Sequence, residues 1–454
     1  MFIRSLFIRS WCIQTGIKNV LLKISYGLIV ALMLPTAQSI AQTVVQQTGQ
    51  QWTLQSSVQQ ALSASPELKK SMAEIGVRQT DINLSSLWPE PSIAFRIDNK
   101  LGQDDATGGY DLTDITISQP IPISRIKYQT SVAEASLKAA RFSRLYQSLQ
   151  VQNRVSKVFF QLQLASAELA LAKKQLQLAD KLINQTEKNT RSVVVRYLTP
   201  LEKMRMTIIR EEADQAASSA EGKYNEALSE FVKLLGIAVD NVATVPELQP
   251  LVEMPDINQL TALQEHHAQL SSQQQQVLAA KHKIDVARNS QLVDPTVGLS
   301  WSRDTFPNGR DDVYAVMFNM QIPLGDRKNA AASKASYKAS QQRIELALLK
   351  RELKINLNKS FTHLNHVVEQ ARGYKQKVLK PAQKMLDLTN RGFSSGELNI
   401  LSLVDANNTY FEARLNYLQL LYQAWVELAE VKLFAGQMIK DVDTQSVSLF
   451  KGEV

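Results

Sequence analysis

The sequence predicts an α+β membrane protein built from long antiparallel helices and four short amphipathic strands, arranged as two internal repeats. Three observations support this fold class. Landmark residues recur about two hundred positions apart, long stretches lack both Gly and Pro, and short segments alternate apolar and polar residues with a period of two. Hydrophobic residues make up 44% and charged residues 21% of the 454-residue chain, which is typical of a folded protein.

The first 41 residues are typical of a secretory signal peptide. Four basic residues precede the apolar run YGLIVALMLP, and the small residues of SIA at 39–41 follow it as a cleavage signal. Removal of this segment lowers the net charge from +8 to +4 (8 − 4 = 4), which gives no basis for nucleic-acid binding. The single cysteine, Cys12, lies in this leader, so the mature chain is expected to lack disulfides.

The rest of the chain reads as two copies of one plan. Gly236 and Gly436 lie 200 positions apart, and Pro91 and Pro295 lie 204 apart. Each repeat is predicted to contain a helix, two strands, a very long helix, a tight turn and a returning helix. We expect a polar segment at 42–52, a first repeat at 53–240, a Pro-rich linker at 241–257, a second repeat at 258–438 and a tail at 439–454.

The helices are predicted from long segments that lack helix breakers. Neither Gly nor Pro occurs from Arg125 to Thr199, so one helix on the order of 100 Å long is expected at about 1.5 Å per residue. The matching segment from Asn329 to Arg391 is interrupted by Gly373 and Pro381, and a kink or break is expected near Pro381. The last helix spaces its apolar residues by steps of three and four, as in coiled coils. A periplasmic coiled-coil scaffold would explain the helices alone.

Four strands are predicted, at about 91–98, 113–122, 295–303 and 312–323. Their alternation gives one face for lipid and one for water, and no segment of the mature sequence has the roughly 20 apolar residues that a membrane-spanning helix needs. Strands in a bilayer must close into a barrel, and four are too few, so three chains with twelve strands are expected. A small soluble sheet capping a helical bundle is the alternative. The predicted lipid-facing residues are Ile93, Phe95, Ile97, Ile115, Ile117, Val297, Leu299, Trp301, Tyr314, Val316, Phe318, Met320 and Ile322.

Over nearly all of the mature chain, from WTLQSSVQQALSASPEL to Gly436, the sequence resembles the TolC family of outer-membrane efflux channels. The most specific segment is GFSSGELNILSLVDANNTYFEARLNYLQLLYQAWVELAEVKLFAG. The resemblance implies a homotrimer in the outer membrane of a Gram-negative bacterium. Its 12-stranded β-barrel would continue into the periplasm as a tunnel of antiparallel helices, an α-helical barrel. The resemblance also implies a tripartite efflux system, with a periplasmic adaptor protein and an inner-membrane transporter.

The expected cargo follows from a closer resemblance within that family. SIAFRIDN, ITISQPIPI and IPLGDRKNAA are similar to the CzcC-like heavy-metal branch, although Ile123-Ser124-Arg125-Ile126 stands where that branch usually has Gly-Gly-Lys-Arg. Export of heavy-metal cations with an RND-type pump is therefore expected. A duct for drugs or small molecules, or for protein secretion, is the alternative.

The sequence contains no recognisable catalytic constellation. It has no cysteine nucleophile in the mature chain, no GxSxG, no phosphate-binding Gly loop and no HExxH. We therefore expect no enzymatic activity, no cofactor and no resident metal. His363 and His366 lie three residues apart on a predicted helix, but without a cysteine or carboxylate at ligand spacing a solvated helix face is favoured over a metal site.

In the TolC family the helix-to-helix turns form the periplasmic mouth and contact the adaptor, and the resemblance implies the same here. Gly396 matches the turn glycine of that family, a position that suits positive φ. Of two acids that narrow the entrance of related channels, Asp405 matches one and Ser402 stands in place of the other, while Glu202 is the equivalent acid of the first repeat. Threefold symmetry would turn each into a ring, and carboxylate rings favour cations. The expected adaptor-contacting residues are Val195, Arg196, Tyr197, Leu198, Ser395, Gly396, Glu397 and Leu398.

Overall fold

The computed structural model describes residues 52–98, 112–123, 125–189, 200–238, 245–251, 253–289, 294–306, 309–320, 326–395 and 397–438. These residues lie in one compact unit, Gly49–Val454. The predicted signal peptide lies outside the described residues. Most of the described chain is helical, and its strands form one sheet.

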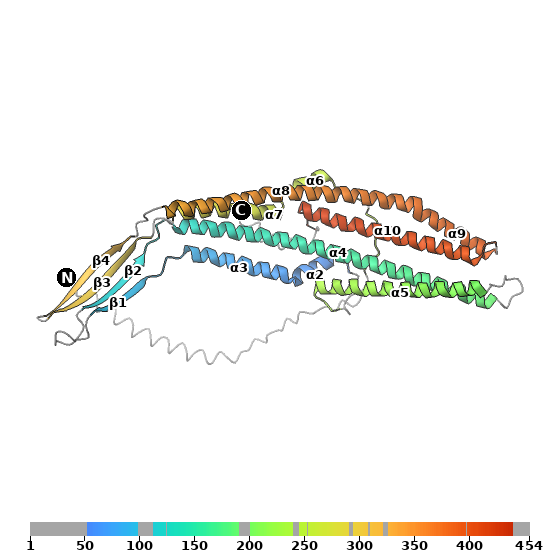
Figure 1. The fold of residues 1–454 in the computed structure, drawn as a ribbon, viewed down its shortest axis with the longest axis horizontal. Coiled ribbons are helices and arrows are strands. Elements are labelled where there is room, and N and C mark those ends of the chain that lie inside the picture. The colour runs from blue at the N-terminus through green and yellow to red at the C-terminus, as the bar shows by residue number, and fades with distance from the viewer. Residues whose placement is uncertain are drawn as a thin grey trace, which may run out of the picture. The chain divides into compact units, whose positions relative to one another are not determined.

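Long helices dominate the unit (Figure 1). They are α2 (Leu54–Ala64), α3 (Pro66–Ser86), α4 (Arg125–Asn189), α5 (Pro200–Leu235), α6 (Ile257–Gln264), α7 (Ala268–Asn289), α8 (Arg327–Tyr374), α9 (Lys380–Ser394) and α10 (Ile400–Ala435). In the described ranges, none of these helices combines the length and the apolar character that crossing a bilayer requires.

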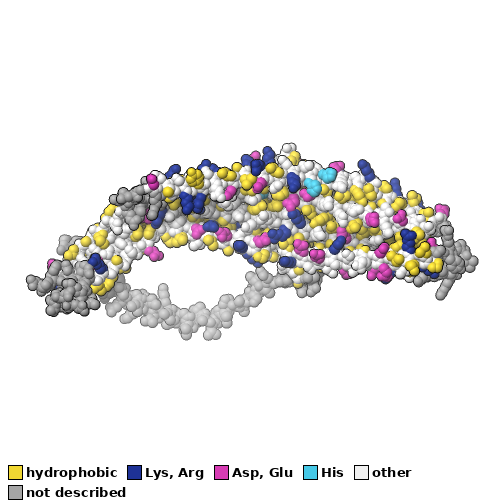
Figure 2. Space-filling model, viewed as in Figure 1, with side chains coloured by type: hydrophobic (Ala, Val, Ile, Leu, Met, Phe, Trp, Pro, Cys, Tyr) yellow, Lys and Arg dark blue, Asp and Glu magenta, His cyan; other side chains and the backbone are white. Residues whose placement is uncertain are grey.

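The strands form an antiparallel sheet in the order β1-β2-β3-β4. Its register brings the apolar residues of all strands to one face, where Ile117 lies between Ile93 and Leu299, and Leu299 pairs with Val316. Much of this face is exposed, with Val316 at 76%, and Figure 2 shows hydrophobic side chains along the strands. The predicted two-faced alternation is therefore present in the fold. The strands are β1 (Ser92–Asp98), β2 (Leu112–Pro120), β3 (Thr296–Phe306) and β4 (Gly309–Asn319).

The second hairpin has longer strands at its loop end than the sequence predicts. The prediction ends β3 at 303 and begins β4 at 312, whereas β3 continues to Phe306 and β4 begins at Gly309. Arg303 lies directly opposite Asp312, and its guanidinium donates to both carboxylate oxygens at 2.7 and 2.9 Å. A charge pair across two strands stabilises the ladder, so residues that resemble a polar loop extend the hairpin.

The helices lie side by side in two rows that share α4 (Figure 1). In the row next to the sheet, α3 packs on α4, α4 on α7, and α7 on α8. In the row farther from the sheet, α5 packs on α4, α4 on α10, and α10 on α9. The described part of α4 has 65 residues and ends at Asn189; the remainder of the predicted helix, 190–199, lies outside the described residues.

Two large apolar clusters hold the rows together. One joins α4 to α5 and α10, and the other joins α8 to α10. Phe160 of α4 stacks on Trp425 of α10 with ring centroids 4.8 Å apart. The indole N–H of Trp425 donates to the carbonyl of Gln249 at 2.8 Å, which ties the predicted linker to the core.

The predicted interruption near Pro381 takes the form of a π-helical turn, Lys375–Leu379, between α8 and α9. Pro381 has no N–H to donate to the preceding turn, and its ring crowds the carbonyl four residues earlier. The wider π turn accommodates both effects, so helical structure continues on either side of the proline.

Candidate functional site

The ends of the two helical hairpins farthest from the sheet are joined by a small apolar cluster. Met206 of α5 is buried with Ile400 and Val404 of α10, and Ile183 of α4 and Phe393 of α9 pack against them. Residues from four helices thus meet at one end of the unit. This cluster brings the starts of α5 and α10, where the family resemblance implies the entrance, to the same place.

The second hairpin turn is built around Gly392. The backbone N–H groups of Glu397 and Leu398 both donate to the carbonyl of Gly392, at 2.9 and 3.0 Å. A Cβ atom at Gly392 would lie 2.8 Å from the Leu398 side chain, so a larger residue there would require Leu398 to move. Ser395 caps the end of α9, with its N–H donating to the carbonyl of Arg391 at 2.9 Å. Gly396, for which positive φ is expected, lies outside the described residues.

Asn399 caps the start of α10. Its side-chain oxygen accepts from the N–H of Ser402 at 2.9 Å and from the Ser402 hydroxyl at 2.8 Å. This cap satisfies a helix-terminal N–H that has no partner within the helix. Asn399 is not among the predicted site residues, although an Asn directly before an apolar helical run is a recognised start signal.

The two predicted entrance acids occupy different environments. Asp405 is exposed on α10, one residue after the buried Val404. Glu202 is half-buried in the first turn of α5, four residues before the buried Met206. Both therefore flank the apolar cluster at the hairpin ends. The remaining predicted tip residues, Val195, Arg196, Tyr197 and Leu198, lie outside the described residues.

An acidic groove lies between α4, α5 and α10, on the side of the apolar cluster that is nearer the sheet. It has a volume of about 380 Å³, and three carboxylates line it: Glu168, Glu212 and Glu412. The Lys223 ammonium lies 3.9 Å from Glu168. Because residues three and four apart share a helix face, Asp405 lies on the face of α10 that carries the groove residues Asn408 and Glu412.

Polar contacts fix the helices around this groove. The Arg210 guanidinium of α5 donates to Asp180 of α4 at 3.1 Å and to the neighbouring Glu211 at 2.6 Å. These bonds, first to Glu211 and then to Asp180, raise the pKa of Arg210 above its ordinary value. Gln175 of α4 donates to Asn408 of α10 at 3.4 Å. The charges at this end are therefore partly paired within one chain.

The histidines form no metal centre in the described part of the chain, where no group of three or more His, Cys, Asp or Glu side chains is placed to hold an ion. His363 Nδ1 lies 2.8 Å from a carboxylate oxygen of Glu427, which links α8 to α10. His366 is exposed. His282 Nδ1 lies 3.9 Å from Asp285 on the same helix.

His267 and Gln264 form a buried clamp on the end of α10. Gln264 donates to the carbonyls of Leu353 and Phe434 at 2.9 and 3.0 Å, and His267 Nε2 lies 3.1 Å from the carbonyl of Leu433. The N–H of Gln269 donates to His267 Nδ1 at 3.1 Å, so this imidazole is neutral with its proton on Nε2. Burial lowers the pKa of His267, and the bond to Leu433 offsets part of that effect.

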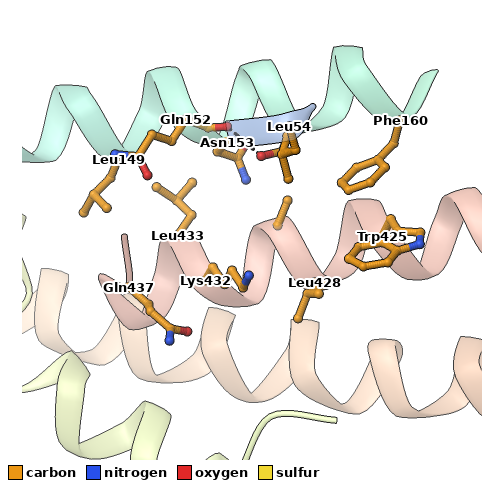
Figure 3. A pocket seen from close by; sticks show the side chains of 12 residues that line it. Leu54, Leu149, Gln152, Asn153, Phe160, Trp425, Leu428, Lys432, Leu433 and Gln437 are labelled. Atoms are coloured by element: carbon orange, nitrogen blue, oxygen red, sulfur yellow. Dashed lines mark hydrogen bonds between the residues drawn. The ribbon is translucent and has the colours of Figure 1, made fainter. Parts of the chain in front are cut away.

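A small cavity lies beside this clamp, between α4 and α10 (Figure 3). Its volume of about 30 Å³ suits one or two water molecules, on the order of one probe sphere each. Lys432 and Asn153 point toward it from the two helices (Figure 3). Burial lowers the pKa of Lys432 below its ordinary value. The cavity is too small for a drug-sized ligand.

The second half of the chain matches a family of known proteins. The family model described as "Outer membrane efflux protein" matches residues 260–437, which include the end of α6, all of α7 to α10, β3, β4 and the second hairpin turn. The match assigns the second half of this chain, residues 260–437, to the outer membrane efflux protein family. The resemblance to TolC-family channels is confirmed, as is the prediction of an outer-membrane transport protein without an enzymatic step.

The efflux protein is also similar to proteins of known sequence or structure over most of its length. It is 21% identical over 422 residues to the cobalt-zinc-cadmium resistance protein CzcC of Cupriavidus metallidurans, covering 90% of this chain and 98% of that one. The crystal structure of the Campylobacter jejuni CmeC outer membrane channel matches with a TM-score of 0.69 at 12% identity, covering 88% of each chain. The open state of the Neisseria gonorrhoeae MtrE outer membrane channel matches with a TM-score of 0.68 at 14% identity, covering 86% of this chain and 91% of that one. These structures show that the efflux protein shares their fold.

Proposed function

We propose that the protein is the outer-membrane exit duct of a tripartite efflux system and that three copies of the chain form it. The observation that carries this proposal is that the sheet and each of the two helical rows, as described, have two open edges. In the described sheet, β1 and β4 each pair with one strand only. An apolar four-stranded sheet with two open edges is unsuited to a bilayer, because its edge N–H and C=O groups lack partners there.

The same open edges recur in both helical rows. The row next to the sheet begins with α3 and ends with α8, and the row farther from the sheet begins with α5 and ends with α9. The outer helices carry large exposed apolar side chains. They are Met72, Val77 and Leu84 on α3; Tyr337, Ile344, Leu348 and Ile355 on α8; Leu201, Met204 and Ile208 on α5; and Met385 and Leu388 on α9.

A head-to-tail arrangement of copies would give a neighbour to every open edge of the sheet and of both helical rows. Each copy would place β4 against β1, α8 against α3 and α9 against α5 of the next copy, and a repeated contact of this kind closes into a ring when the rotation between copies divides a full turn. Charges support the contact between α9 and α5. Exposed Lys380 and Lys384 lie near the apolar side chains of α9. On α5, exposed Glu211, which also accepts from Arg210, and the groove residue Glu212 follow Ile208. Three copies give twelve strands, a number in the range of known outer-membrane barrels.

An internal duplication is part of this proposal, and matched local structures support it. Gly236 ends α5 with φ of 65°, and Gly436 ends α10 with φ of 74°. The amide of Gln60 donates to the carbonyl of Leu235 at 3.4 Å, and that of Gln264 donates to the carbonyl of Phe434 at 3.0 Å. In each half, a short helix thus caps the end of the returning helix.

We propose heavy-metal cations as the cargo. The relative CzcC is named for cobalt, zinc and cadmium resistance, and the hairpin ends carry the exposed Asp405 and the groove acids Glu168, Glu212 and Glu412. Carboxylates in a water-filled passage attract cations without holding them tightly. The adaptor would contact the hairpin turns around Ser395, Glu397 and Leu398, and an RND-type inner-membrane transporter would supply the energy.

Cysteine cross-linking tests the ring contact, because the predicted mature chain contains no cysteine. Ile208 lies eight residues past the start of α5 (208 − 200), and Met385 lies nine residues before the end of α9 (394 − 385). The two positions are therefore at similar distances from the hairpin ends. Mature protein carrying Ile208→Cys and Met385→Cys should form covalent dimers and trimers on mild oxidation. Each single variant is the control. Cross-links within one chain only, or none in the double variant, would contradict the proposed ring.

A further inference from the structure

One boundary of the apolar sheet face changes from apolar to aromatic to ionic over three successive residue pairs. Leu299 lies opposite Val316, Trp301 opposite Tyr314, and Arg303 opposite Asp312. These residues share one face, because side chains alternate along each strand. Tyr314 and Val316 are 79% and 76% exposed. This sequence of layers is what a membrane boundary requires, with aromatic rings between the hydrocarbon and the headgroups.

The charged layer holds its guanidinium in a fixed orientation. Asp312 accepts two hydrogen bonds from Arg303, and the Arg303 guanidinium carbon lies 5.1 Å from the centre of the Trp301 ring. Because a guanidinium has five N–H donors, three remain after these two bonds. The pair is therefore neutral overall but still presents oriented donors toward the boundary.

Arg310 adds a second guanidinium to the same face. Arg310 lies two residues before Asp312 on β4, so both side chains are on the same face. It pairs with residue 305 of β3, and its side chain is exposed. Long side chains at diagonal positions of neighbouring strands can reach one another. Arg303, Arg310 and Asp312 together carry a charge of +1 beside two aromatic rings. Phosphate is the group that such paired guanidinium forks recognise best.

We propose that Arg303 and Arg310 bind the phosphate of a lipid headgroup in the outer leaflet. This inference rests on the proposed function, in which the helices extend into the periplasm and the hairpin loops face outward. The neighbouring exposed face of Leu299, Val316 and Phe318 would contact the acyl chains of the same lipid. A lipid phosphate fits this surface better than free phosphate, because only the lipid also covers the apolar band.

Lipid binding to the mature protein in detergent, followed by native mass spectrometry, tests the proposal. The probes are lipid A with two phosphates and the same lipid with both phosphates removed. Wild-type protein should bind the phosphorylated form about tenfold more tightly, the size expected from one or two charge-assisted hydrogen bonds. Arg310→Gln, and separately Arg303→Gln combined with Asp312→Asn, should lose most of this preference.

Arg96→Gln is the matched control. Arg96 lies on the opposite face of the sheet. It pairs with Asp114, which pairs with Ser302, the residue between Trp301 and Arg303 in β3. It should keep the preference. Equal binding of both lipids to wild type, equal loss in all three variants, or full competition by inorganic phosphate would overturn the proposal. The same spectra report the oligomeric state, so a trimer without lipid preference would contradict this inference alone, whereas loss of the trimer in wild type would contradict the proposed function.

Discussion

The side chain of Asn399 accepts two hydrogen bonds from Ser402, one from its backbone N–H at 2.9 Å and one from its hydroxyl at 2.8 Å. Ser402 stands where the family resemblance implies an entrance acid. The serine therefore has a local role in starting α10, beside the exposed Asp405 one turn later. Position 402 is exposed, so its side chain can be changed without disturbing the buried cluster of Met206, Ile400 and Val404.

Ser402→Asp should increase the cation selectivity of the channel. A carboxylate at this position would lie one turn from Asp405, and it is favourable in the first turn of a helix because of the helix dipole. Reversal potentials in a salt gradient across planar bilayers would measure the change. Ser402→Ala is the control, since it removes the hydroxyl without adding charge. An identical reversal potential for Asp and Ala at this position would mean that residue 402 does not face the conducting path.

Neutralising the predicted entrance acids should have the opposite effect. Asp405→Asn combined with Glu202→Gln should lower cation selectivity and weaken block by divalent ions, because the local negative potential falls. The same bilayer measurement applies, with Asp387→Asn on α9 as a control for the loss of a carboxylate outside the predicted entrance. If the double variant and the control behave alike, the entrance is formed by other residues.

Asn399→Ala should destabilise the start of α10 by about 1 kcal/mol, the usual cost of losing a side-chain N-cap. Hydrogen exchange of the backbone N–H groups near Ser402 should become faster, while exchange in the middle of α10 should not change. Asn399→Asp keeps an acceptor oxygen and should preserve protection. Unchanged exchange in the alanine variant would show that the cap contributes nothing to the order of the turn.

Acid should weaken the clamp formed by His267. Because burial lowers the pKa of His267 below its ordinary value of 6.5, the folded protein binds a proton less readily than the unfolded chain does. The contribution is fully present above about pH 6.5 and is lost as pH falls from there toward the lowered pKa. Protonation would also remove the acceptor that the Gln269 N–H requires.

The stability of wild type and His267→Gln should therefore converge as pH falls below about 6.5. Urea unfolding followed by circular dichroism at several pH values would measure this. His282→Gln is the control, because His282 is partly exposed and faces Asp285 on its own helix. Parallel pH profiles for wild type and His267→Gln would show that this imidazole does not couple folding to protonation.

The fold was largely predictable because its main elements have local signals. Alternating residues such as Ile93, Phe95 and Ile97 predict strands regardless of their neighbours, and the absence of Gly and Pro after Arg125 predicts α4. The ends of the second hairpin were not predicted, because Arg303 and Asp312 stabilise the strands only when they face each other. The order of charges along the sequence does not show which residues face each other across two strands.

The candidate site was less predictable, because it depends on residues distant in the sequence. The cap by Asn399 does have a local signal, because Asn399 directly precedes the apolar run of α10. The acidic groove, in contrast, joins Glu168, Glu212 and Glu412 from three helices. The clamp joins Gln264 to Leu353 and Phe434. No spacing rule connects such positions until the order of helices within each row is known.

The mass of the detergent-purified mature protein tests the central claim most directly. Four strands per copy, with open edges at β1 and β4, require further copies to close the sheet, and three copies give twelve strands. Native mass spectrometry should therefore show a complex of three chains that persists as detergent is removed in the gas phase. A stable monomer, or a complex with another number of chains, would contradict the account.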